Sequence, residues 1–160
     1  MSSKRSRGGA TPSRRALTKA MLLPMDRVSA QKQSLALHLA LVACRAGHGN
    51  SHLFNELMET VYVAWFLQQE GYGDEPADLF KLAEEAVEAA LQLGQATGEY
   101  LLADDAVPAF EKLLALHDAQ VNVAPLHKIA AADGRLRRFL LGTARSPIPG
   151  DRENGQRSLN

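Results

Sequence analysis

The sequence has only one cysteine and no long uninterrupted apolar stretch, and each of these absences narrows the class of protein. One thiol cannot close a disulfide within the chain, which favours a reducing compartment over a disulfide-stapled secreted scaffold. No segment approaches the run of about eighteen apolar residues that a membrane-spanning helix requires. The basic N-terminal segment lacks the apolar region of a secretory signal, because Lys19 interrupts its first apolar residues. We therefore expect a cytoplasmic protein without a membrane partner.

Motifs of the common enzyme and cofactor classes are also missing. The chain contains no GxGxxG, no P-loop, no GxSxG and no HExxH. These motifs mark dinucleotide sites, nucleotide phosphate sites, hydrolase nucleophiles and zinc proteases, respectively. We therefore predict no catalytic residue, no cofactor and no metal, and we expect that the protein is not an enzyme.

Charged residues balance over the whole chain but are unevenly distributed. Residues 1–45 hold nine Lys and Arg against one acid, and residues 126–160 hold seven against three. Residues 46–125 hold fourteen acids against two basic residues. Basic ends around an acidic middle indicate either a polyanionic partner for the ends or charge-mediated contact between chains.

The apolar residues of residues 13–141 recur with the period of α-helices, and no segment is predicted to be a strand. Helices are predicted at about 13–23, 29–46, 52–70, 76–97, 106–121 and 125–141. Residues 1–12 and 142–160 are rich in Ser, Gly, Pro and Arg and have few apolar side chains to bury. The sequence therefore predicts an all-α, single-domain bundle of five to six helices over 13–141, with a disordered basic N-terminal arm at 1–12 and a disordered C-terminal tail at 142–160.

The predicted helix at 29–46 has a special pattern. Its leucines alternate at positions 35, 37, 39 and 41, which taken alone would suggest a strand. Its length and Gly47, at a C-cap position, favour a helix with Asp26 or Ser29 as its N-cap. Because it is apolar nearly all round, we predict that it is the buried central helix of the bundle.

The segment CRAGHGNSH, residues 44–52, contains potential metal ligands at regular spacing. Cys44, His48 and His52 supply a thiol and two imidazoles at successive intervals of four residues. A structural zinc site usually needs four such ligands. The fourth would have to come from elsewhere, for instance from His38.

A turn between two helices accounts for the same segment without a metal. Gly47 suits the left-handed position after a helix, Gly49 is expected to relieve the turn through a positive φ, and Asn50 or Ser51 can cap the next helix. We therefore interpret the segment as the elbow of a helical hairpin.

Two further groups of titratable residues are predicted to be structural. His117 lies within the apolar face of its predicted helix, where a buried core histidine is commoner than a catalytic base. Glu84, Glu85 and Glu88 have no histidine within 20 residues, so they do not form the Glu-x-x-His motif of a di-iron bundle. We predict that this acidic cluster is a solvated outward face.

The helix predicted at 125–141 is amphipathic, with leucines on one side and basic residues on the other. Together with the basic arm, it carries the charge pattern of nucleic-acid-binding proteins. The residues predicted to contact nucleic acid are Lys4, Arg5, Arg7, Arg14 and Arg15 in the arm and Lys128, Arg135, Arg137 and Arg138 in the helix. Alternatively, these basic residues serve only solubility and the helix dipole.

The segment IAAADGRLRRFLLG, residues 129–142, resembles the end of Fis-type DNA-binding regulators, in which an Ala-rich helix, a Gly turn and a basic recognition helix close the chain. The turn is about four residues shorter here than in that family, and Phe139 occupies a basic position. The whole chain is also similar to small proteobacterial proteins of accessory or mobile elements, some labelled Fis-family regulators. This resemblance implies a bacterial transcriptional regulator in which Arg135, Arg137 and Arg138 contact DNA.

Two functions from different classes follow from these patterns. The first is a small regulatory or accessory protein that contacts nucleic acid through its basic arm and last helix. The second is a helical protein-interaction module, whose acidic middle binds a basic partner or the basic ends of another copy. An enzyme that uses His117 or the elbow would need a motif that the sequence lacks.

Overall fold

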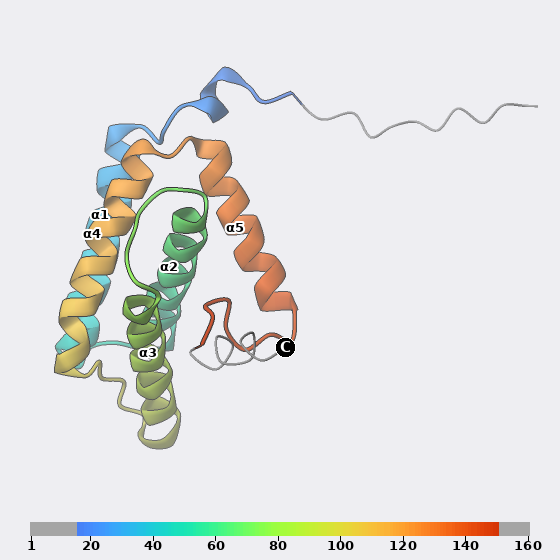
Figure 1. Ribbon diagram of the computed structural model, residues 1–160. Coiled ribbons are helices and arrows are strands. Elements are labelled where there is room, and N and C mark those ends of the chain that lie inside the picture. Colours follow the sequence, from blue (N-terminus) through green and yellow to red (C-terminus); the bar gives the residue numbers. More distant parts are fainter. Residues whose placement is uncertain (1–15, 151–160) are drawn as a thin grey trace, which may run out of the picture.

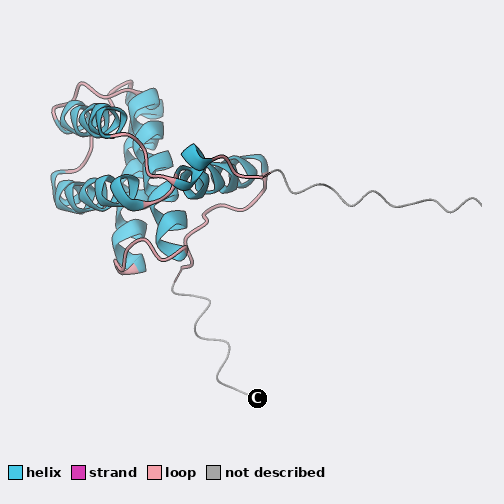
Figure 2. Ribbon diagram, turned by 90° about the horizontal axis from the view of Figure 1, so that it is seen from above, coloured by secondary structure: helices cyan, strands magenta, loops and turns pink. Residues whose placement is uncertain are grey.

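Five α-helices form most of residues 16–150, the part of the chain that the computed structural model describes (Figure 1). They are α1 (Arg27–Arg45), α2 (Ser51–Gln69), α3 (Ala77–Thr97), α4 (Val107–Val123) and α5 (Leu126–Leu141), with 3-10 turns η1 (Lys19–Leu22) and η2 (Asp104–Ala106). Figure 2 shows only helices and loops over the described residues. The predicted all-α bundle is confirmed, but the helix predicted at 13–23 is wrong, because only the four-residue turn η1 is helical within residues 16–23.

α2 is the centre of the bundle. It packs against each of α1, α3, α4 and α5, and nine of its nineteen residues are buried. The fully buried side chains include Phe54 and Leu57 from α2, Phe80 from α3 and Phe110 from α4. Aromatic side chains bury the most area per residue, so the helix that carries most of them occupies the middle of the core. Within residues 16–150, no helix is both long and apolar enough to cross a membrane.

α1 lies at the edge of the bundle, so the prediction that it is the buried central helix is wrong. It contacts α2 and runs antiparallel beside α4 (Figure 1). Only four of its nineteen residues are buried: Ala30, Ala40, Leu41 and Cys44. The apolar residues of α1 surround the helix, and the bundle covers only one of its faces.

The elbow between α1 and α2 is the predicted hairpin turn, with one correction. Gly47 has a φ of +79°, and the side chain of Asn50 accepts a hydrogen bond of 3.0 Å from the Leu53 amide. Gly49 does not have the positive φ that was predicted. It is required for space, because a Cβ there would lie 2.8 Å from the Phe54 ring and 3.1 Å from the Cys44 Sγ.

Residues 142–150 are ordered against the bundle, so the predicted disordered tail is wrong for this segment. Ile148 is only 2% exposed and belongs to the core. The Lys81 Nζ donates to the Ser146 Oγ at 3.1 Å, and this bond holds the segment to α3. The predicted arm at 1–12 and the rest of the predicted tail, 151–160, lie outside the described residues.

The predicted solvated face of α3 is also corrected. Glu84 is 3% exposed, whereas Glu85 is exposed and Glu88 is half-buried. The Glu84 carboxylate accepts hydrogen bonds from the Tyr62 hydroxyl at 2.7 Å and from the Lys81 Nζ at 2.8 Å. These two donors replace the water that a buried carboxylate loses.

Candidate docking surface

Four large apolar side chains lie in a line on the outward face of α1. Their exposed fractions are 76% for Val28, 61% for Leu35, 58% for Leu39 and 61% for Val42. At 100° per residue, these positions fall within about 60° of one another, on the side of α1 opposite its buried residues. We call these four residues the α1 stripe.

A continuous apolar line of this kind differs from the scattered exposed residues of an ordinary surface. The stripe is continuous only over its second half, because the exposed polar residues Gln31 and Lys32 lie between Val28 and Leu35. No polar side chain interrupts the line from Leu35 to Leu39 and Val42. Because these side chains are exposed, their burial against another molecule would be favourable.

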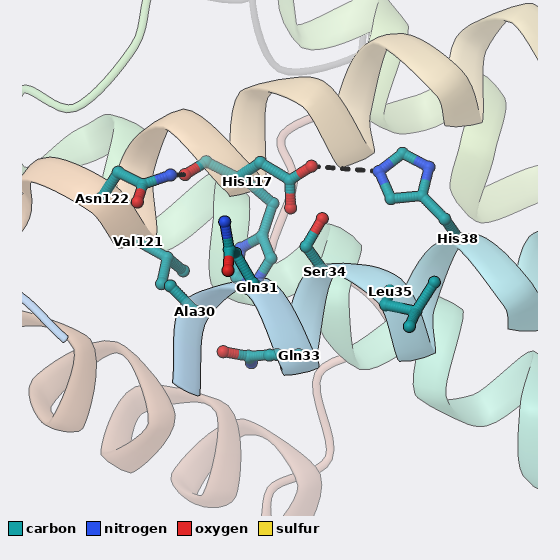
Figure 3. A pocket seen from close by; sticks show the side chains of 10 residues that line it. Ala30, Gln31, Gln33, Ser34, Leu35, His38, His117, Val121 and Asn122 are labelled. Atoms are coloured by element: carbon teal, nitrogen blue, oxygen red, sulfur yellow. Dashed lines mark hydrogen bonds and ion pairs between the residues drawn. The ribbon is translucent and has the colours of Figure 1, made fainter. Parts of the chain in front are cut away.

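A groove of about 410 Å³ runs between α1 and α4 beside the stripe (Figure 3). Leu35 belongs to both the stripe and the groove wall. His38 from α1 and Asp118 from α4 span the groove, with 3.0 Å between the His38 Nε2 and the Asp118 Oδ2. Gln31 and Asn122 add amide groups to the wall. The surface therefore combines an apolar ridge with a polar groove.

His117 lines the groove from its buried side. It is 3% exposed, so its predicted place in the core is confirmed. Burial lowers the pKa of His117, although the nearby carboxylate of Asp118 partly opposes this shift. Its Nδ1 has no hydrogen-bond partner among the described residues. The imidazole is therefore held neutral in the packed interior.

The groove also brings together the residue types of a hydrolase triad. Ser34, His38 and Asp118 supply a hydroxyl, an imidazole and a carboxylate. Acyl transfer needs a hydroxyl that donates to the imidazole and amides that are free to stabilise an oxyanion. Ser34 makes no hydrogen bond to His38 within residues 16–150 and lies in the middle of α1, where the amides serve the helix. In this structure, His38 is therefore not placed to activate the Ser34 hydroxyl.

The basic residues predicted to bind nucleic acid are placed only in part. Those of the arm, Lys4, Arg5, Arg7, Arg14 and Arg15, lie outside the described residues. On α5, Lys128 forms an ion pair of 2.7 Å with Glu70, which raises the pKa of Lys128 and lowers that of Glu70.

The other three basic residues of α5 differ in how many contacts they make within the bundle. The guanidinium of Arg135 lies 4.4 Å from the centroid of the Phe66 ring and donates to the Gln69 side chain at 2.7 Å. Arg137 pairs with Asp133 at 2.7 Å. Arg138 is exposed and has no ion pair within residues 16–150. The basic face of α5 is therefore largely paired within the bundle.

The elbow does not bring its three potential metal ligands to one point. Cys44 is fully buried, and burial raises the pKa of its thiol to about 11. His48 and His52 are exposed, and the His52 Nε2 lies 3.9 Å from the Glu56 carboxylate. Over residues 16–150, no group of three or more His, Cys, Asp or Glu side chains is arranged to hold a metal ion.

The docking surface depends on contacts that the sequence did not indicate. His38 and Asp118 are 80 residues apart, so no local spacing connects them. The stripe, by contrast, could have been predicted from the α1 sequence, because α1 has more apolar residues than one buried face of a helix can hold. No protein-family model matches this chain, and no curated protein and no solved structure matches it either.

Proposed function

We propose that this chain is a helical protein-interaction module that docks a partner on the α1 stripe and the adjoining groove. The observation that carries the proposal is the line of four exposed apolar residues, Val28, Leu35, Leu39 and Val42, on a helix whose opposite face is packed in the core. Within the acidic cluster on α3, the alternative contact surface for a basic partner, Glu84 is buried and only Glu85 is fully exposed.

The size of the stripe indicates the strength of the contact. Complete burial of one such side chain is worth about 1.5–3 kcal/mol, and each is already about 40% covered on average. Burial of the remaining area would contribute about 1–2 kcal/mol per residue, or about 4–8 kcal/mol in total. Since association itself costs several kcal/mol, the stripe needs further contacts for a stable complex.

The groove can supply these contacts. The amides of Gln31 and Asn122 and the His38–Asp118 pair line the same groove as Leu35. An apolar centre with polar groups at its rim is the usual composition of a protein interface. The polar rim would then select the partner, and the stripe would provide most of the affinity.

Nucleic-acid binding, the other function that the sequence predicts, makes different demands. A phosphate backbone would compete with Glu70 for Lys128 and with Asp133 for Arg137. Exposed ion pairs are weak, so this competition reduces binding without preventing it. This function remains a prediction, and the experiment for the proposed function tests it as well.

Co-purification of the tagged chain from its host cells tests the proposal. The variant Leu35→Gln/Leu39→Gln should lose a partner protein that the wild-type chain retains after nuclease treatment. The matched control is Leu82→Gln/Leu93→Gln, which changes two exposed leucines of α3 and should keep the partner. Equal recovery with both variants would refute the proposal, and loss of all partners on nuclease treatment would favour nucleic acid.

A further inference from the structure

The spacing of the α1 stripe indicates the shape of what covers it. Val28, Leu35 and Val42 are separated by seven residues each, and Leu39 lies between the last two. Apolar residues at intervals of seven form the seam of nearly parallel helix pairs. From Val28 to Val42, the seam is about 21 Å long, which matches a helix of about four turns.

The Lys and Arg residues of α1 itself are not balanced by acids on the same helix. At 100° per residue, Arg27 and Arg45 lie on one side of the stripe, whereas Lys32, seven residues before Leu39, lies nearly in line with Leu39, between Val28 and Leu35. All three are exposed, and α1 itself contains no Asp or Glu. The nearest acid along the chain, Asp26, accepts the amide of Ser29 as the N-cap of α1.

α4 carries two acids on the side that faces α1, Asp118 and, seven residues earlier, Glu111, and neither forms an ion pair with Arg27, Lys32 or Arg45 among the described residues. The carboxylate of Asp118 on α4 is bonded to His38. Glu56 and Glu59 of α2 line a separate hollow with Ala36 and Leu37, on the flank of α1 that faces away from the stripe. The stripe is therefore an apolar seam to which α1 itself adds only cations, with Lys32 within the seam and Arg27 and Arg45 at its flank.

We infer that the occupant of this surface is an amphipathic helix of a partner protein, with an apolar face flanked by Asp or Glu. Acidic flanks would meet Arg27, Lys32 and Arg45 across the seam and would fix the register of the partner helix. A second copy docked α1 against α1 would place these same cations opposite one another. The inference depends on the proposed function and specifies its partner.

Binding of designed helical peptides to the full chain tests this inference. Three peptides of about four turns would share one leucine seam and differ only in their flanking residues, which would be Glu, Gln or Lys. Fluorescence anisotropy at low salt should give the tightest Kd for the Glu peptide and the weakest for the Lys peptide, about tenfold apart. Added salt should weaken only the Glu peptide.

Charge reversal on α1 gives the matched test. Lys32→Glu/Arg45→Glu should reverse the order of the peptides, whereas Arg138→Glu on α5 should leave it unchanged. All of these residues are exposed, so the helical circular dichroism spectrum should be retained. Equal binding of the three peptides, or tightest binding of the Lys peptide, would overturn the inference.

Three other outcomes would also overturn the inference. Together with the co-purification experiment, they show whether the proposed function fails as well. A wild-type dimer that Leu39→Gln converts to a monomer would identify a second copy as the occupant. If no peptide binds but the co-purified partner is lost with the stripe variant, the proposed function stands and the helical acidic partner is wrong. If the partner survives that variant as well, both proposals fail.

Discussion

Removal of the Tyr62 hydroxyl tests the buried hydrogen bond between Tyr62 and Glu84, a residue that the sequence predicted to be exposed. Tyr62 is 4% exposed and donates to the Glu84 carboxylate at 2.7 Å. In Tyr62→Phe, the carboxylate keeps Lys81 but loses its second donor. The phenyl ring keeps its edge contact with Phe139, at 5.3 Å between centroids. The change therefore isolates one hydrogen bond.

The magnitude follows from burial and charge. A hydrogen bond to a charged group contributes about 1.5–3 kcal/mol, and the Glu84 acceptor is only 3% exposed. We expect Tyr62→Phe to lower the free energy of unfolding by about 2 kcal/mol. In the background of Glu84→Gln, where the acceptor is neutral, the cost should fall to about 1 kcal/mol.

Urea unfolding followed by circular dichroism measures these values. Tyr100→Phe is the matched control, because Tyr100 is half-buried and its hydroxyl has no hydrogen bond among the described residues. It should cost less than about 0.5 kcal/mol. If Tyr62→Phe cost no more than this control, the buried Glu84 contact would not contribute to stability, and the reasoning would be refuted.

The same bond predicts a dependence on alkaline pH. Burial, and then the hydrogen bond to Glu84, raise the pKa of Tyr62 well above its ordinary value of 10.0. Above that value, the unfolded tyrosine loses its proton while the folded one keeps it, so the stability contribution falls as the pH rises. Tyr62→Phe should remove this part of the alkaline loss.

Four further experiments have expected outcomes. Gly94→Ala should destabilise the protein by about 1–3 kcal/mol in urea unfolding, because its Cβ would lie 2.1 Å from the Tyr100 ring. Gly134→Ala in α5, where an added Cβ would meet only the Arg138 side chain at 3.7 Å, should stabilise the protein by up to about 1 kcal/mol. If both glycine variants destabilised the protein, or both stabilised it, the packing described here would be contradicted. Burial lowers the pKa of His117 below 6.5, so acidification below that pH favours the unfolded, protonated chain; thermal unfolding of His117→Leu should show a smaller acid loss than the wild type. The Cys44 thiol, with its pKa raised to about 11 by burial, should react with Ellman's reagent only after unfolding, and rapid reaction in the native protein would contradict its burial.

Local patterns predicted the helices well, because helix formation and capping depend on neighbouring residues. The 3.6-residue period located all five α-helices, and Asp26 and Asn50 are caps as expected. Gly98, with a φ of +79°, ends α3. These features need no knowledge of the rest of the chain.

The arrangement of the helices depended on contacts between distant residues and was predicted less well. α1 was expected at the centre because it is apolar all round, but α2 occupies that place and leaves one face of α1 exposed. Glu84 was expected outside because it is charged, but Tyr62, 22 residues away, satisfies it in the core. Ile148 is buried although its neighbours, Pro147 and Pro149, suggested an unstructured tail.

The most direct test of the docking surface is photo-crosslinking in living host cells. A photoreactive amino acid would replace Leu39 in the stripe or, as the control, Leu93 on α3, which is exposed to a similar degree. The proposed function predicts a protein adduct of defined mass from the position of Leu39 and none of that mass from the position of Leu93. The same adducts from both positions, or none from the position of Leu39, would contradict docking on the α1 stripe.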